Sequence, residues 1–227
     1  MGYILEVLGN VLDILQYAWE LLPALMGGVA TTLKVFAFTI VLSIPLGIVV
    51  ALGRLSRVRL FQRITQFYIW VMRGTPLLLQ LIFIFFGLPM IGITFSRFTS
   101  VMIAFSLNYA AYYGEIFRGG IASIDRGQYE AAEMLGMDKR LTFFRVILPQ
   151  VIKRTLPAVA NEVITLVKDT SLVYILGMSE LLRAAKIAAN RDVTLVPLLV
   201  AGVFYLVLTA ILTKVFQRLE ERYAYYE

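Results

Sequence analysis

Long apolar stretches alternate with short polar ones along this chain. Several of them contain uninterrupted apolar runs of about 20 residues, the length that a helix needs to cross a hydrocarbon core of about 30 Å. The pattern predicts five transmembrane helices, at residues 22–52, 65–90, 98–118, 156–178 and 193–214. It indicates an all-α, polytopic membrane protein in which residues 1–227 form a single transmembrane domain.

Residues 1–20 show a different pattern, with polar and apolar positions on opposite faces of a helix. At 100° per residue, four polar residues fall on one narrow arc, opposite a face rich in leucine. They are Glu6, Asn10, Asp13 and Glu20. We expect an amphipathic N-terminal helix that lies in the membrane interface. A loosely ordered tail is the alternative.

The composition supports a membrane protein and limits the chemistry. Apolar residues make up 59% of the chain and the mean hydropathy is +0.79, well above the values of soluble domains. The sequence contains no cysteine and no histidine, which excludes disulfides, His-ligated zinc and a Ser-His-Asp triad. Catalysis by carboxylates, lysine or tyrosine stays open. We expect no metal site and no cofactor bound by this chain.

The basic residues are divided unequally between the two sides of this topology. One side has only Arg97, Arg183, Lys186 and Arg191. The other collects Arg54, Arg57, Arg59, Arg63, Arg118, Arg126, Lys139, Arg140, Arg145, Lys153, Arg154, Lys214, Arg218 and Arg222. Because cytoplasmic loops carry an excess of Lys and Arg, the N-terminus should lie outside and the C-terminus in the cytoplasm. The bias also explains the net charge of +6 without nucleic acid as a partner.

Residues 119–155 form a polar insert, which this topology places in the cytoplasm. Asp125 can cap a short helix, and Gly136 can end it in the left-handed conformation that glycine adopts readily. Asp138 can cap a second segment that Pro149 stops. Two short helices joined at a glycine would make a compact knob able to enter a groove of a partner. A solvated loop of two interfacial helices is the alternative.

Motifs in and around this insert resemble those of a known family. Glu130-Ala131-Ala132, Gly136 and Leu148-Pro149 stand at the spacing of the EAA motif of ATP-binding cassette (ABC) importer permeases, with Val146 at the usual Ile. Four further strings resemble the polar amino acid permeases of the histidine/glutamine type. They are Arg73-Gly74-Thr75-Pro76-Leu77, Tyr113-Gly114-Glu115-Ile116-Phe117-Arg118-Gly119-Gly120, Gly127-Gln128-Tyr129 and Lys168-Asp169-Thr170-Ser171-Leu172. The resemblance runs from about residue 20 to the C-terminus. Gly114, often Ala in that pattern, is expected to alter helix propensity rather than chemistry.

The resemblance implies that the insert is a cytoplasmic coupling-helix (EAA) loop. In that family, the loop is seated in a cleft of an ATPase whose closure moves the membrane helices. Glu130 would hydrogen-bond at the cleft, and Ala131, Ala132 and Gly136 would permit close approach. The chain has no G-x-x-x-x-G-K-[ST] sequence with which to bind ATP. We therefore expect a transport subunit and no enzyme, with ATP and Mg used by a separate ATPase.

The resemblance also implies partners and a location. The chain would work with ABC ATPase subunits, a second permease subunit in a homodimer or heterodimer, an extracytoplasmic amino acid binding protein and a small-molecule amino acid. It would be a multi-pass protein of the bacterial inner membrane, in contact with lipid.

Polar residues inside three of the predicted spans form the candidate substrate site. A charge at the bilayer centre costs about 2.5–3.5 kcal/mol by insertion scales, so ionisable residues there are functional candidates. Helical stepping places them on one face of each span. The candidates are Arg73 and Gln80, then Asn108, Tyr112 and Glu115, then Glu162, Thr165 and Asp169.

Pro76 lies between Arg73 and Gln80. It has no N–H to donate, so it should free the carbonyl of Met72 and kink the helix. Polar faces on three helices suggest a common water-accessible cavity for an amino acid. Its ammonium would meet carboxylates, and its carboxylate would meet Arg73 or freed backbone groups.

The alternative for these charges is that they only neutralise one another, Lys168 with Asp169 or Glu162 and Arg73 with a neighbour. The acids exceed the nearby bases by one, which mildly favours a cationic amino acid. The competing function is a self-sufficient secondary transporter or channel, although we find no inverted internal repeat. A membrane-embedded enzyme acting on lipid has no recognisable motif here.

Overall fold

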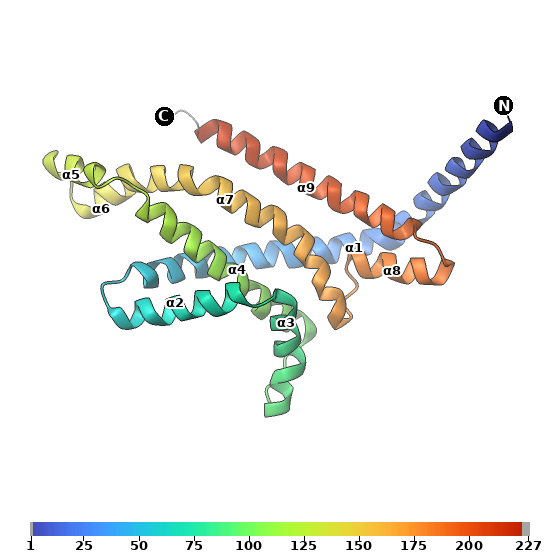
Figure 1. Cartoon of the computed structure of the whole chain (residues 1–227), viewed down its shortest axis with the longest axis horizontal. Coiled ribbons are helices and arrows are strands. Elements are labelled where there is room, and N and C mark those ends of the chain that lie inside the picture. The colour runs from blue at the N-terminus through green and yellow to red at the C-terminus, as the bar shows by residue number, and fades with distance from the viewer. Residues whose placement is uncertain (1, 224–227) are drawn as a thin grey trace. The chain divides into compact units, whose positions relative to one another are not determined.

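The structure, a computed structural model, describes residues 2–223, with side chains from Leu12 onward. The described chain is a series of helices (Figure 1). In order they are α1 (Gly2–Leu55), α2 (Arg59–Gly74), α3 (Leu77–Ile82), η1 (Phe83–Gly87), η2 (Leu88–Ile91), α4 (Arg97–Ala122), α5 (Arg126–Met134), α6 (Lys139–Thr142), η3 (Phe143–Ile147), α7 (Leu148–Asp169), η4 (Thr170–Leu176), α8 (Leu181–Asp192) and α9 (Val196–Tyr223). Of these, η1 and η3 are π-helical turns, and η2 and η4 are 3₁₀ helices.

The chain divides into two compact units. Unit 1 consists of Met1–Ala37 and Leu166–Ala210, and unit 2 of Phe38–Thr165 and Ile211–Glu227. Both candidate functional regions, the proline-containing break and the polar insert, belong to unit 2.

Unit 1 is built around α8. Apolar residues of α1, α8 and α9 form its core, and they are Leu21, Leu25, Val29, Leu181, Ala185, Ala188 and Ala201. Gly28 permits the close contact of α1 with α8, because a Cβ at this position would lie 2.8 Å from the Cα of Leu181. This packing explains one difference from the sequence-based expectation. Residues 1–20 and 22–52 are not separate helices, since α1 continues through the expected break.

The continuity of α1 has a physical reason. Pro23 lies at the expected break, but Leu21 and Leu25 on either side are only 3% and 0% exposed, so tertiary packing holds the helix across it. Glu6 and Asn10, half of the polar arc expected on residues 1–20, lie outside the residues whose side chains are described. The interfacial location of that segment stays a prediction.

Glu180 is a buried acid of unit 1 that the sequence pattern did not single out. It is 0% exposed and caps α8, because its carboxylate accepts hydrogen bonds from the backbone N–H groups of Leu182 and Arg183, both at 2.6 Å. The Tyr205 hydroxyl also donates to it at 3.1 Å. Burial raises the pKa of Glu180. The residue ties the start of α8 to α9 by satisfying the first free amides of the helix.

Unit 2 is built around α4, which packs against α2 and α3. Val101, Phe105, Ala110, Ala111 and Tyr113 of this helix are all 0% exposed. Small residues bring the second half of α1 close to α4. A Cβ at Gly47 would lie 2.6 Å from the Cβ of Tyr113, and one at Gly114 would lie 2.6 Å from a methyl group of Val50. Gly114 therefore affects the packing of α1 against α4 as well as the helix propensity of α4.

Gly114→Ala is expected to lower the stability of the protein by up to about 2 kcal/mol. The added methyl group overpacks the contact with Val50, at a cost of about 1–3 kcal/mol, which outweighs the gain of about 1 kcal/mol in helix propensity. Val50 is β-branched and cannot easily rotate away. Thermal unfolding in detergent measures the effect.

Gly119→Ala on the same helix is the matched control. Within the described part of the chain, nothing beyond the helix's own backbone lies within 4 Å of the Cβ that this change adds, so only the gain in helix propensity remains. Gly119→Ala should raise the unfolding temperature. A Gly114→Ala protein as stable as the Gly119→Ala protein would contradict the close-packing argument.

Two predicted spans are single helices with shifted ends, and two are not. Residues 98–118 lie within α4, and 193–214 correspond mostly to α9. Residues 156–178 are divided between α7 and η4. Residues 65–90 are broken, because the helices Arg59–Gly74 and Leu77–Ile91 meet at an angle of 103°. Pro76 is the cause, since it cannot continue the hydrogen-bond ladder of α2.

Length and hydropathy single out fewer spanning helices than the five expected. Within residues 2–223, Leu12–Leu55 and Val196–Tyr223 are long and apolar enough to cross a membrane, and the bent pair could make a third span. The helices α4 and α7 carry more polar positions, as helices that face other protein do. The count of five stays a prediction.

Candidate substrate site and coupling hairpin

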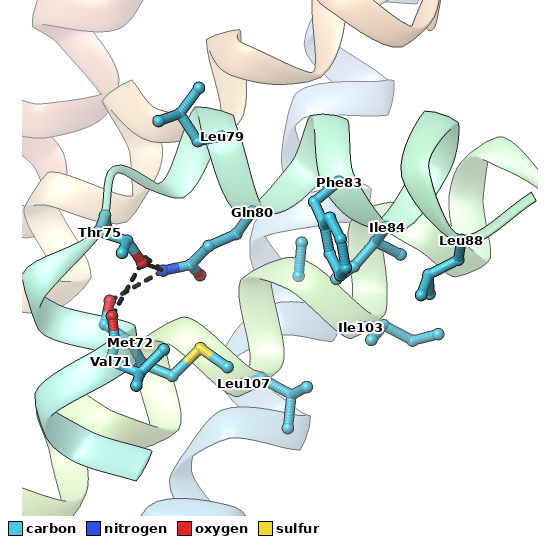
Figure 2. A pocket seen from close by; sticks show the side chains of 11 residues that line it. Val71, Met72, Thr75, Leu79, Gln80, Phe83, Ile84, Leu88, Ile103 and Leu107 are labelled. Atoms are coloured by element: carbon cyan, nitrogen blue, oxygen red, sulfur yellow. Dashed lines mark hydrogen bonds between the residues drawn. The ribbon is translucent and has the colours of Figure 1, made fainter. Parts of the chain in front are cut away.

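The break between α2 and α3 leaves one backbone carbonyl without a partner in its own helix, as the sequence predicted. The oxygen of Met72 accepts hydrogen bonds from the side-chain amides of Gln80 and Asn108, each at 2.9 Å. Without Pro76, this oxygen would accept from the backbone N–H of residue 76. Two side chains from two helices therefore satisfy the group that the proline frees. Figure 2 shows the one from Gln80.

Thr75 extends this network, although the sequence reasoning did not single it out as a site residue. The Nε2 of Gln80 lies 2.8 Å from the Thr75 hydroxyl and 3.2 Å from its carbonyl oxygen, as Figure 2 shows. The Nδ2 of Asn108 also donates to the Oε1 of Gln80 at 3.1 Å. Asn108 is 4% exposed. Its position directly before Pro76 is the feature of the sequence that could have identified Thr75 as part of the network.

A cavity of about 510 Å³ lies beside this network. Its wall is mostly apolar, and Gln80 is the one predicted substrate residue among those that line it (Figure 2). The lining residues are Val71, Met72, Thr75, Leu79, Gln80, Phe83, Ile84, Leu88, Ile103, Ala104 and Leu107. This cavity therefore lacks the polar lining expected of the substrate pathway.

Two of the predicted charges have close partners within unit 2. The guanidinium of Arg73 lies 5.0 Å from the ring centroid of Tyr112, a cation–π distance. Glu115 pairs with Arg118 one turn further along α4, where Nε and Oε2 are 2.9 Å apart. The structure thus joins Arg73 with Tyr112 and Gln80 with Asn108, while Glu115 has a partner that the sequence reasoning did not consider.

The remaining candidates lie on or at the end of α7. Glu162 and Thr165 are half-buried residues of unit 2, and Glu162 is close enough to Tyr113 of α4 to interact with it electrostatically. Asp169 is the last residue of α7 and belongs to unit 1. Their part in binding a substrate stays a prediction.

The polar insert is a hairpin of two short helices, and its turns have the expected chemistry. Asp125 caps α5 by accepting the N–H of Gly127 at 2.6 Å, and Asp138 caps α6 by accepting the N–H of Leu141 at 2.7 Å. Gly136 lies between the two helices with a φ of +75°, which residues other than glycine adopt at a cost. The structure thus has a capped helix on each side of Gly136, where the sequence pattern led us to expect them.

The second half of the hairpin differs from expectation at Pro149. The chain remains helical there, because η3 leads directly into α7 and Pro149 is the second residue of α7. The turn before it, η3, is π-helical, and such a local change of hydrogen bonding accommodates a proline that cannot donate to the α-helical ladder. The hairpin is therefore continuous with α7, a connection able to transmit displacement.

The two faces of α5 have different environments. Ala132 is 3% exposed, so the close contact it allows is within the chain's own structure. Glu130 and Ala131 are exposed, and helical stepping places Met134, which is 88% exposed, on the same side. This side, consisting of Glu130, Ala131 and Met134, is called the outer face of α5 below. An exposed apolar methionine beside a small residue is typical of a protein contact surface.

The helical fold, the helix break whose freed carbonyl is hydrogen-bonded and the hairpin in the polar insert agree with a membrane permease of the ABC class. Residues 43–225 match the family model described as "Binding-protein-dependent transport system inner membrane component". The chain belongs to this family. It is the membrane component of an ABC transporter, and the ATPase activity belongs to a separate subunit.

Named relatives are amino acid permeases. The chain is 40% identical to the arginine transport system permease protein ArtQ of Bacillus subtilis, over 88% of this chain and 93% of the relative. It is 38% identical to the L-cystine transport system permease protein TcyB of the same organism, over 90% of each. Among solved structures, an amino acid ABC transporter with histidines matches with a TM-score of 0.84 and 34% identity, over 93% of this chain and 97% of that one.

Proposed function

We propose that this chain is the permease subunit of an ABC importer for polar, basic amino acids. The similarity to an arginine permease supports the basic class, while the similarity to a cystine permease extends the polar class beyond it. The candidate acids Glu162 and Asp169, together with Glu115, which already pairs with Arg118, would favour a cationic substrate. Those residues would meet ammonium or guanidinium groups, and Arg73 and Gln80 near the helix break would meet the α-carboxylate.

The observation that carries the proposal is the hairpin whose two helices meet at Gly136. Its outer face exposes Glu130, Ala131 and Met134, and α6 continues through η3 into α7. A force applied to α5 would therefore reach a helix that carries the candidate residues Glu162 and Thr165. In this proposal, the ATPase receives the outer face in a cleft, and Glu130 hydrogen-bonds within it.

The proposed assembly has two permease subunits, two ATPase subunits that use ATP and Mg, and an extracytoplasmic binding protein. The permease would cross the bacterial inner membrane five times. The hairpin and the C-terminus would be cytoplasmic and the N-terminus outside, as the distribution of basic residues predicts. A homodimer is the simplest arrangement.

Glu162→Gln is expected to lower the uptake of arginine and lysine about tenfold or more. It removes a charge-assisted contact worth about 1.5–3 kcal/mol, and about 1.4 kcal/mol corresponds to a factor of ten. The assay uses proteoliposomes with the cognate ATPase and binding protein and a panel of amino acids. Glu115→Gln tests the second acid in the same way.

Glu221→Gln is the matched control, since Glu221 is an exposed acid near the end of α9. It should leave uptake of every amino acid unchanged. If the Glu162→Gln and Glu115→Gln proteins transport the whole panel as the parent does, the assignment of the substrate site is wrong. Uptake driven by an ion gradient without ATP would instead favour a secondary transporter.

A further inference from the structure

One face of α2 combines arginines with exposed aromatic rings. At 100° per residue, Arg59, Arg63, Gln66, Phe67 and Trp70 fall within an arc of about 100°. Arg59 and Arg63 are exposed, Phe67 is 64% exposed and Trp70 is 70% exposed. We call these five residues the arginine–tryptophan face. The positive-inside bias explains why bases occur on this side, but it does not explain why they align with two uncovered aromatic rings.

A shallow cavity of about 320 Å³ lies on this face. Arg63, Gln66, Phe67 and Trp70 line it. The two rings are 5.9 Å apart and tilted by 38°. Arg63 and Trp70 are two turns apart, or about 10 Å along the helix. The cavity therefore has a cation at one end and an aromatic surface at the other, which matches a charged headgroup and the adjoining part of a lipid chain.

Acidic residues are missing from a long part of the sequence around this face. No Asp or Glu occurs between Glu20 and Glu115. Within the described residues, no arginine of the set Arg54, Arg57, Arg59 and Arg63 forms a salt bridge. Arg54 instead donates to the Oε1 of Gln66 at 3.4 Å. The positive charge at this end of α2 is thus available to an anion from outside the chain.

The turn that carries these arginines is held by specific contacts. Gln62 donates to the carbonyl oxygen of Ser56 at 2.6 Å, and the N–H of Val58 donates to the Ser56 hydroxyl at 3.1 Å. Gly53 packs against Thr65, because a Cβ at Gly53 would lie 2.5 Å from a methyl carbon of Thr65. The end of α1 and the start of α2 therefore keep the arginines at fixed positions along the face.

We propose that the arginine–tryptophan face binds the headgroup of an anionic phospholipid. Arg59 and Arg63 would hold the phosphate, and Phe67 and Trp70 would contact the glycerol and upper acyl region. Basic clusters next to a membrane helix attract anionic lipid by about 1 kcal/mol per residue. A second copy of this chain is a poorer occupant, because two such faces related by a two-fold axis would bring arginines together.

The test uses the fluorescence of Trp70 in the transporter reconstituted with its ATPase. The variant Trp19→Phe leaves Trp70 as the sole tryptophan of this chain. A second variant that also has Trp70→Phe gives the background fluorescence, which is subtracted before quenching is compared. Vesicles contain brominated phosphatidylglycerol or brominated phosphatidylcholine at equal mole fractions. We expect phosphatidylglycerol to be preferred at least about fivefold, which about 1 kcal/mol provides. The double variant Arg59→Gln with Arg63→Gln should bind both lipids almost equally, with a preference ratio of nearly one.

Lys214→Gln with Arg218→Gln is the control, because these bases are also exposed and four residues apart on one helix. The control should keep the full preference. The proposal would be overturned if both lipids quenched Trp70 equally, or if the control variant lost the preference for phosphatidylglycerol as fully as the arginine variant. The absence of any quenching would also overturn it, since protein would then cover the face. Displacement of phosphatidylglycerol by inorganic phosphate alone would mean that the site takes the free anion. Quenching does not require transport, so this test is independent of the proposed importer function.

Discussion

Ala131→Trp is expected to reduce ATP-driven amino acid uptake at least about tenfold while the partner ATPase continues to hydrolyse ATP. Ala131 is exposed on the outer face of α5, so a large side chain there leaves the hairpin intact and obstructs only a partner. Overpacking at a close contact costs about 1–3 kcal/mol, and about 1.4 kcal/mol is a factor of ten in affinity. Uptake and phosphate release measured in the same proteoliposomes give the ratio of the two activities.

Two further variants separate docking from folding. Ala122→Trp adds the same bulk at an exposed position at the end of α4 and should leave the ratio unchanged. Ala132→Trp is expected to reduce the amount of folded protein, because Ala132 is only 3% exposed. Normal uptake by the Ala131→Trp protein would mean that the outer face of α5 is not seated in the ATPase.

Removing both side-chain amides at the helix break is expected to have the largest effect on stability. In the double variant Gln80→Ala with Asn108→Ala, the carbonyl of Met72 loses its two hydrogen bonds of 2.9 Å. Hydrogen bonds between membrane helices contribute about 0.6–2 kcal/mol each, and a buried carbonyl without a partner costs about 1–3 kcal/mol. The free energy of unfolding should fall by about 2–4 kcal/mol.

A double-mutant cycle measured by unfolding in detergent tests this expectation. Each single variant leaves one donor on the Met72 oxygen, so the double variant should lose more than the sum of the single losses. Ser106→Ala is the control on the same helix as Asn108, because the buried hydroxyl of Ser106 has no hydrogen-bond partner. Because this change removes a buried polar group that has no partner, it should not lower the free energy of unfolding. Additive losses would mean that another group satisfies the carbonyl.

Local chemistry explains which parts of the sites could be predicted. Pro76 cannot donate a hydrogen bond, so the sequence alone identified the Met72 carbonyl as a free acceptor. The caps at Asp125 and Asp138 and the left-handed turn at Gly136 follow from residue types within a few positions of each helix end. Interactions of this kind depend on neighbouring residues, and the structure contains the corresponding contacts.

Long-range packing decided what could not be predicted. The expected break before residue 22 is absent because Leu21 and Leu25 pack into the core of unit 1. The sequence indicated only an effect of Gly114 on helix propensity. In the structure, a Cβ at this position would lie 2.6 Å from a methyl group of Val50, 64 positions earlier in the sequence, so Gly114 also permits close packing. Ala132, expected at a partner's surface, is buried in the chain's own packing. Helical stepping describes one helix and cannot show which neighbour covers each face.

The amino-acid sequence by itself determined that this is a helical membrane protein, where its polar insert lies and which motifs relate it to ABC permeases. These properties depend on hydropathy and on short-range spacing, which a single chain segment contains. Only the tertiary structure decided that α2 turns through 103° at Pro76 and that Asn108 of α4 reaches the freed carbonyl. Both depend on the relative placement of helices, which is set by side-chain packing between residues far apart in the sequence.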